Sequence, residues 1–182
     1  QRVRETLDYA IRRGVKCGAL FLEEGRKVTA KRQLGTWMGK QIWRKGVEVS
    51  KDELKAAFDQ MTGIGNLEIY SHLGITDPDA IISKVKYMAR ALGCRIIALD
   101  HISIIVSGME SDNERKDLDL LMTNLRALVE ETQICLLYVS HLKRPDGTPH
   151  EEGGRVTLGH LRGSGAIAQL SDLIISGERN QQ

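Results

Sequence analysis

The sequence has few cysteines, little net charge and no long apolar run. Each of these absences argues against one class of protein. Its three cysteines, Cys17, Cys94 and Cys135, lie far apart, each in or beside a predicted strand. We expect them to be small buried residues in a reducing compartment, with a disulfide or a metal site as the less favoured alternative. The net charge of +2 argues against a broadly basic DNA coat protein but is compatible with a local basic loop. Because no apolar run approaches the length of a membrane span, we expect no membrane partner.

The remaining composition is ordinary for a globular protein. Hydrophobic residues make up 41% of the 182 residues and charged residues 27%, which is enough apolar material for one full-sized core. The chain carries neither an internal repeat nor a low-complexity segment. The sequence therefore predicts a single domain over residues 1–182.

Helical and apolar segments alternate along the chain. Two helix starts carry capping signals, Ser50 with Glu53 and Asp77 with Pro78. The alternation predicts an α/β fold whose mostly parallel sheet is flanked by helices on both faces. Helices are expected near residues 1–13, 27–44, 50–61, 77–92, 114–132 and 166–170, and buried strands near 17–22, 67–70, 95–100, 134–139 and 172–176.

Polar side chains stand at the ends of three predicted strands. Glu23 follows the first strand, Asp100 ends the third, and Ser140 and His141 follow the fourth. In parallel sheets, ligands bind beyond the carboxyl ends of the strands. Asp100 suits a hydrated Mg²⁺ that bridges nucleotide phosphates and Glu23 suits a general base, although a strand cap and a solvated turn charge are the plainer alternatives. The order of these strands along the chain does not decide whether they are neighbours in the sheet. If they are, a base, a metal ligand and a polar sensor meet at one edge, as in an NTP-hydrolysing site.

Two polar, glycine-containing segments late in the chain carry basic residues. Residues 141–156 include Lys143, and residues 161–166 read Leu-Arg-Gly-Ser-Gly-Ala. Flexible loops with Lys or Arg and exposed backbone N–H groups bind phosphates of a nucleotide or of nucleic acid. Trp37 and Trp43 also lie near basic residues, but their helical spacing favours packing over base stacking.

Six short segments, in this order along the chain, carry a resemblance. They are Leu-Glu-Glu at 22–24, Leu-Asp-His-Ile-Ser at 99–103, Ser-His-Leu-Lys at 140–143, Leu-Arg-Gly-Ser-Gly-Ala at 161–166, Gln-Leu-Ser-Asp at 169–172 and Glu-Arg-Asn-Gln-Gln at 178–182. Together they resemble the helicase domain of bacteriophage primase–helicases, in the DnaB-type hexameric helicase superfamily with a RecA-like P-loop NTPase fold. The resemblance covers essentially the whole chain, and the ordered set is far more specific than any single segment.

The resemblance implies a motor function. Members of this family translocate 5′ to 3′ on single-stranded DNA as a homohexameric ring, driven by hydrolysis of Mg²⁺-bound NTP between subunits. For this chain it implies Mg²⁺ as cofactor, ATP or dTTP as substrate, and primase and polymerase as replication partners. It also implies a cytoplasmic location in a bacterial or phage-infected host.

The resemblance also implies roles for individual residues. Glu23 would be the catalytic base, Asp100 the Walker-B ligand of Mg²⁺, and His141 a catalytic-site sensor of the γ-phosphate. On the nucleotide side, Gln169 would couple nucleotide state to the DNA loops and Arg179 would contact the nucleotide. The residues implied to face the DNA backbone are Lys143, Arg162, Gly163 and Ser164.

The sequence departs from the family's pattern in three respects. It contains no G-x-x-x-x-G-K-[ST] segment, the loop that cradles nucleotide phosphates and that in the family lies directly before the helix predicted at residues 1–13. The family's later strands, which carry an arginine finger, would follow Asn180. We therefore expect a partial RecA-like domain of a longer enzyme, inactive by itself. Ala168 stands where phage relatives can carry a basic residue, so we expect one DNA contact to be lost.

Two other functions are compatible with the same fold. One is a non-catalytic RecA-like fragment that offers a surface for subunit or DNA contacts. The other is a RecA- or KaiC-like ATPase that does not unwind DNA. The paired DNA-loop segments at 141–144 and 162–164 argue against the latter, because an ATPase that does not act on DNA would not need them.

Overall fold

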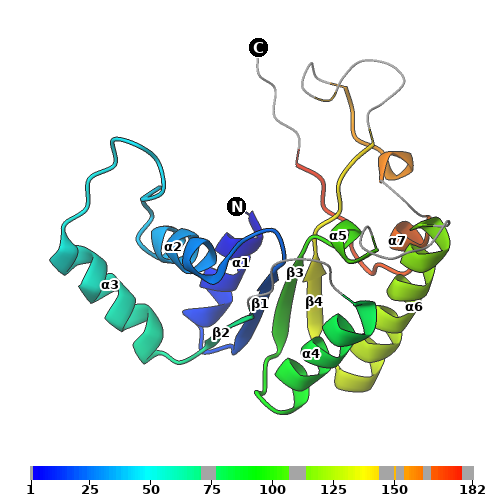
Figure 1. Ribbon diagram of the computed structural model, residues 1–182, viewed down its shortest axis with the longest axis horizontal. Helices are drawn as coiled ribbons and strands as arrows, with labels where there is room; N and C mark the ends of the chain where they lie inside the picture. The colour runs from blue at the N-terminus through cyan, green and yellow to red at the C-terminus, as the bar shows by residue number, and fades with distance from the viewer. Residues whose placement is uncertain are drawn as a thin grey trace.

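A parallel four-stranded sheet forms the centre of the computed structural model, which describes residues 2–70, 77–106, 114–143, 150, 154–161 and 165–177 (Figure 1). The strand order is β2–β1–β3–β4, and every pairing between neighbours is parallel. The predicted α/β class with a mostly parallel sheet is confirmed. The strands are β1 (Cys17–Phe21), β2 (Leu67–Tyr70), β3 (Ile96–Asp100) and β4 (Cys135–Tyr138).

Helices cover both faces of this sheet (Figure 1). Helix α1 lies on one face and helices α4 and α6 lie on the other, while α2 and α3 extend beyond the β2 edge. The described helices are α1 (Arg2–Ile11), α2 (Arg26–Trp37), α3 (Lys51–Gly63), α4 (Pro78–Arg90), α5 (Ser103–Val106), α6 (Glu114–Thr132) and α7 (Ala166–Gln169), with a 3-10 turn η2 (Leu158–His160). None of them is both long and apolar enough to span a membrane.

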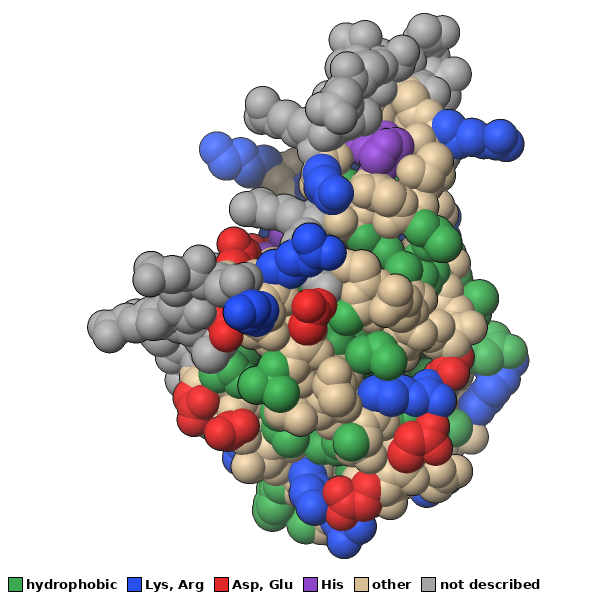
Figure 2. Space-filling view, turned by 90° about the vertical axis from the view of Figure 1, so that its right-hand side faces the viewer, with side chains coloured by type: hydrophobic (Ala, Val, Ile, Leu, Met, Phe, Trp, Pro, Cys, Tyr) green, Lys and Arg blue, Asp and Glu red, His purple; other side chains and the backbone are tan. Residues whose placement is uncertain are grey.

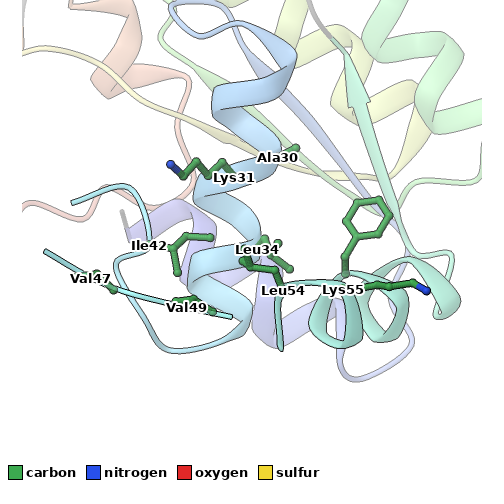
Figure 3. Close-up of a pocket in the computed structure, with 9 residues that line it drawn as sticks. Ala30, Lys31, Leu34, Ile42, Val47, Val49, Leu54 and Lys55 are labelled. Carbon is green, nitrogen blue, oxygen red and sulfur yellow. The ribbon is translucent and has the colours of Figure 1, made fainter. Parts of the chain in front are cut away.

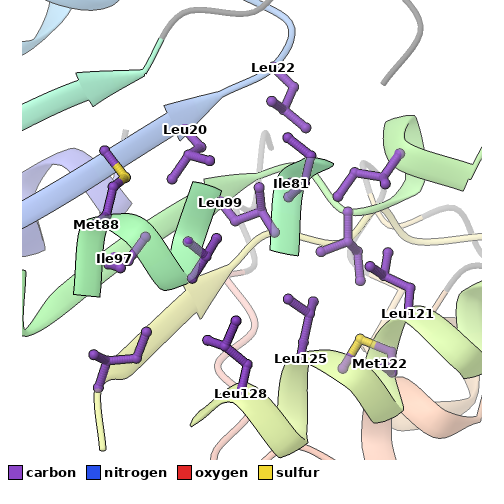
Figure 4. Packing of buried hydrophobic residues seen from close by; sticks show 14 of the residues in the cluster. Leu20, Leu22, Ile81, Met88, Ile97, Leu99, Leu121, Met122, Leu125 and Leu128 are labelled. Carbon is purple, nitrogen blue, oxygen red and sulfur yellow. The ribbon is translucent and has the colours of Figure 1, made fainter. Parts of the chain in front are cut away.

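Side chains of the two central strands alternate between two cores. Leu20 on β1 and Leu99 on β3 point toward α4 and α6 (Figure 4). Phe21, the residue after Leu20, and Ala98, the residue before Leu99, pack with Leu7 of α1 on the opposite face. This alternation is the period of two of a β-strand, and burial on both faces explains why these strands read as continuous apolar runs.

The predicted helix caps are present. The Ser50 side chain accepts a hydrogen bond from the backbone N–H of Glu53 (3.1 Å), and the Asp77 side chain accepts one from that of Asp79 (3.2 Å), with Pro78 at the first position of α4. The capping box at Ser50 is only half formed, because the Glu53 carboxylate contacts Lys40 (2.5 Å) instead.

Trp37 and Trp43 pack against a third apolar cluster, which joins α2 to α3. The preference for packing over base stacking is therefore confirmed. The helix predicted over residues 27–44 ends earlier, at Trp37, where Gly39 adopts a left-handed φ of +66° and the chain turns.

The strand predicted over residues 172–176 is wrong. No strand is assigned to residues 171–177, and Leu173 and Ile175 are 77% and 84% exposed. An apolar run predicts burial, but a strand also needs a partner, and within the described residues this segment pairs with neither edge of the sheet.

Two of the three cysteines fit the predicted structural role. Cys17 and Cys94 are buried, and burial raises the pKa of each thiol to about 11, which keeps it protonated and inert. Cys135 is exposed on the edge strand β4, so its predicted burial is wrong. All three lie within the described residues and are free thiols.

Candidate active site at the carboxyl edge of the sheet

The carboxyl ends of β1, β3 and β4 meet because these strands are neighbours in the sheet. The backbone ladder continues past the strands: the N–H of Leu22 donates to the carbonyl of Asp100 (2.7 Å), and the N–H of Ile102 donates to that of Val139 (3.0 Å). These bonds fix the positions of the residues that follow each strand. Strand order, which the sequence left open, thus places Glu23, Asp100 and His141 at one edge.

Glu23, His101 and His141 form a contiguous cluster at this edge. His101 Nε2–H donates a hydrogen bond to Glu23 Oε1 over 2.8 Å. The His101 and His141 rings lie edge to face with centroids 4.0 Å apart. His101 is buried, whereas Glu23 and His141 are exposed. The Glu23 carboxylate is therefore oriented from the protein side and open on the solvent side, as a general base requires.

Glu24, the other carboxylate of this turn, is held by two guanidinium groups. Arg4 of α1 lies 2.6 Å from it, and Arg32 of α2 contacts its second oxygen. The Arg4 side chain is only 6% exposed and lies over the Phe21 ring, 4.2 Å from its centroid. Glu24 thus ties α1 and α2 to the end of β1, which leaves Glu23 as the carboxylate able to meet water.

Asp100 carries the clearest electrostatic perturbation of the site. Burial raises the pKa of its carboxyl group, Arg4 and His101 oppose this, and the nearby Glu23 and Glu24 add to it. No described residue donates a hydrogen bond to the carboxylate. A partly buried carboxylate whose lone pairs no described donor occupies, with further acidic groups beside it, fits a divalent cation, whose charge would favour its ionised form.

Lys143 lies beside His160 and Leu161, which directly precede the second predicted DNA segment. Its backbone N–H donates to the carbonyl of His160 (2.7 Å), and Leu142 forms an antiparallel bridge with Leu161. Residues 139–143 rise from the carboxyl edge of the sheet in Figure 1, and Figure 2 shows that basic side chains lie both near this end and elsewhere on the face, with acidic ones among them. Lower on that face, acidic and basic side chains alternate.

The structure brings together only part of the predicted site. Gln169 is exposed at the end of α7, and no hydrogen bond or ion pair of the described residues links it to Glu23, Asp100 or His141. Four predicted site residues lie outside the described residues, so their roles stay predictions: Arg162, Gly163, Ser164 and Arg179.

Three groups at this edge carry no sequence signal of their own. His101 has no motif beyond the segment that contains it, although its place directly after Asp100 puts it at the same strand end. Arg4 and Arg32 lie on helices with no motif, and their convergence on Glu24 is visible only once α1 and α2 are placed.

An apolar pocket of about 490 Å³ lies elsewhere, between α2, α3 and the segment that joins them (Figure 3). Its lining includes no carboxylate, histidine or cysteine, so we assign it no catalytic role. The lining residues are Ala30, Lys31, Leu34, Ile42, Val47, Val49, Leu54, Lys55 and Phe58.

Replacing Arg4 by alanine should lower the free energy of unfolding by about 3 kcal/mol, because it leaves the mostly buried Glu24 short of one of its two cations. Urea unfolding followed by circular dichroism measures the change. Arg2→Ala is the matched control on the same helix: its pair with Glu5 is exposed, and we expect an effect below about 0.5 kcal/mol. Equal effects of the two substitutions would mean that the Arg4–Glu24 pair does not join α1 to the sheet.

Comparisons with known proteins agree with this architecture. Residues 8–182 match the family described as DnaB-like helicase C terminal domain. The sequence is 38% identical over 185 residues to the DNA helicase/primase of Enterobacteria phage T3, covering 98% of this chain and 32% of that protein. It is 27% identical over 120 residues to the replicative DNA helicase DnaC of Bacillus subtilis (strain 168), covering 63% and 25%.

Two solved structures share the fold. One, an ATPase domain, superposes with a TM-score of 0.67 at 19% identity, covering 93% of this chain and 63% of that one. The other, the structure of a DnaB-like replicative helicase and its interactions with primase, gives 0.66 at 19% identity, covering 93% and 43%. The predicted RecA-like fold is confirmed. The chain spans about a third of the length of its phage T3 relative.

Proposed function

The chain belongs to the family of DnaB-like helicase C-terminal domains, and from that membership we propose that it is the motor core of a replicative DNA helicase. In this proposal, hydrolysis of Mg²⁺-bound ATP or dTTP between subunits of a homohexameric ring drives 5′ to 3′ translocation on single-stranded DNA. Primase and polymerase are the replication partners, and the site of action is the cytoplasm of a bacterial or phage-infected host.

The observation that carries the proposal is the meeting of Glu23, Asp100 and His141 at one edge of the sheet. A base, a metal ligand and a polar sensor are the groups that phosphoryl transfer to water requires. The surrounding contacts differ among the three, so each group is suited to a separate task.

Glu23 orients the attacking water and accepts its proton. The hydrogen bond from His101 Nε2 (2.8 Å) engages one carboxylate oxygen, and the exposed side of the group is left for water. Because His101 is buried, it holds the carboxylate from a fixed position. Glu24 is unsuited to this role, since Arg4 and Arg32 occupy its oxygens.

Asp100 would hold the Mg²⁺ ion, with no other described side chain competing for its lone pairs. When bound, the ion would supply positive charge that offsets the negative charge on the nucleotide phosphates. Arg4 and His101 favour the ionised carboxylate that such a ligand needs.

His141 and Lys143 lie two residues apart on the segment that follows β4. His141 touches the catalytic cluster through His101, while Lys143 is exposed beside residue 160. A change in the position of His141 on loss of the γ-phosphate would therefore be passed to Lys143 through a short piece of backbone. This gives a physical route from hydrolysis to DNA contact.

Lys143→Ala should weaken single-stranded DNA binding and reduce the slope of log K against log salt by about 0.7–1, the share of one phosphate contact. Fluorescence anisotropy at several salt concentrations measures this slope. Lys55→Ala, which removes an exposed lysine from α3, should leave the slope unchanged. An unchanged slope in Lys143→Ala would remove Lys143 from the DNA path.

The proposal is tested by unwinding of a forked duplex with the full-length protein. We expect Mg²⁺- and NTP-dependent unwinding when the loading strand has a free 5′ tail and little when only a 3′ tail is offered. Hydrolysis without unwinding would favour the RecA- or KaiC-like ATPase, and absence of both would favour a non-catalytic module.

A further inference from the structure

Glu23, His101 and His141 also have the composition of a metal site. Each offers one ligand atom, and these atoms all lie within 4.8 Å of one another. The three residues follow three different strands of the sheet, so the backbone holds them in place. This donor set differs from that of the Asp100 site, because imidazole nitrogens are poor ligands for Mg²⁺ and good ligands for later first-row metals.

We propose that Glu23, His101 and His141 bind a late first-row transition metal ion, with Zn²⁺ as the preferred species. Two histidines and a carboxylate with one open position match the three-ligand zinc sites of proteins. At bond lengths near 2.1 Å, ligand atoms of a tetrahedral ion lie about 3.4 Å apart. The Glu23–His101 pair, at 2.8 Å, opens slightly to admit the ion, and the proton that Nε2 donates to Glu23 moves to the other ring nitrogen, Nδ1, which has no partner among the described residues. The exposed Glu23 and His141 side chains adjust without disturbing the core.

The burial pattern supports a ligand at this place. His101 is 7% exposed, and its Nε2 faces the Glu23 carboxylate, so the proposed ligand nitrogen is held in a fixed position by the buried ring. Glu23 and His141 are exposed and leave an access path and a fourth position for water.

The ion would inhibit the motor, a consequence that rests on the proposed function. Bound Zn²⁺ occupies the Glu23 oxygen that orients water and the His141 nitrogen that senses phosphate. Because Mg²⁺ prefers an all-oxygen site, excess Mg²⁺ should not displace Zn²⁺.

Binding is tested first, without nucleotide and without an activity readout. Full-length protein stripped with a chelator is titrated with Co²⁺, whose visible absorption reports tetrahedral coordination, and Zn²⁺ is then added as competitor. We expect His141→Ala and His101→Asn each to weaken Co²⁺ binding at one site about 100-fold or more, since even outer-shell changes cost about 10–100-fold. His141 is exposed, so its variant keeps the test informative should His101→Asn fail to fold.

His160→Ala is the matched control. His160 pairs with His150 at a ring-centroid distance of 4.9 Å, the other close histidine pair of the described residues, and its replacement should leave the titration unchanged. Unchanged binding in His141→Ala, or loss in His160→Ala alone, would overturn the proposal. If His141→Ala loses Co²⁺ binding while the parent protein hydrolyses no NTP, the metal site stands. Only the proposed function would then be contradicted.

Discussion

Glu23→Gln is expected to abolish DNA-stimulated NTP hydrolysis while nucleotide binding is retained. Glutamine keeps the size and the contact with His101 but cannot accept a proton from water, and loss of a general base costs about 10²–10⁴-fold in rate. Steady-state hydrolysis by the full-length protein with saturating single-stranded DNA measures the rate. Binding of a fluorescent nucleotide, measured in parallel, separates catalysis from affinity.

The neighbouring Glu24 provides the matched control. Glu24→Gln makes the same chemical change one residue away, but it loosens the ion pairs to Arg4 and Arg32 and leaves Glu23 intact. We expect lower stability and hydrolysis within about tenfold of the parent, well short of the loss that removal of a general base causes. The reverse pattern, with Glu24→Gln inactive and Glu23→Gln active, would contradict the assignment of the base.

Asp100→Asn is expected to abolish Mg²⁺-dependent hydrolysis and, in the absence of Mg²⁺, to stabilise the fold. Burial raises the folded-state pKa of Asp100 above its ordinary value. Folding therefore favours the protonated form, and the associated stability is present below the ordinary pKa and lost as the pH rises through the raised one. At neutral pH the ionised carboxylate lowers the free energy of unfolding, and asparagine, which has no charge, does not. Functional groups commonly lower stability in this way.

The thermal midpoint of Asp100→Asn at pH 7 without Mg²⁺ should exceed that of the parent, because asparagine removes the ionised carboxylate that burial disfavours. The difference should narrow as the pH is lowered through the raised folded-state pKa. Adding Mg²⁺ and nucleotide should then raise the midpoint of the parent and not that of the variant. A destabilised variant would mean that the carboxylate makes structural hydrogen bonds, and retained hydrolysis would place the metal ligand elsewhere.

Local patterns were sufficient for most helices and for the central strands. The cap at Asp77 and the apolar stripe of residues 114–132 correspond to helices in the structure, since both signals act within a few residues. Residues 172–176 show where local reasoning fails. Their apolar run resembles that of β3. Strand β3 is hydrogen-bonded to a strand on each side, whereas within the described residues this segment pairs with no strand and its apolar side chains are exposed.

The rule that ligands bind beyond parallel strands predicted where the candidate site lies before the strand order was known. Glu23, Asp100 and His141 each ended or followed a predicted strand, and the order β2–β1–β3–β4 made those strands neighbours. Two contributions were not predictable in this way. The pairing of Glu24 with Arg4 and Arg32 is a long-range contact between α1, α2 and a turn, and the direction of the His101 ring depends on packing.

The central claim, that this edge of the sheet hydrolyses NTP in response to DNA, is tested most directly by one measurement. The hydrolysis rate of the full-length protein is compared with and without single-stranded DNA at saturating Mg²⁺ and nucleotide. We predict strong stimulation by DNA. Hydrolysis that does not respond to DNA, or no hydrolysis at all, would contradict it.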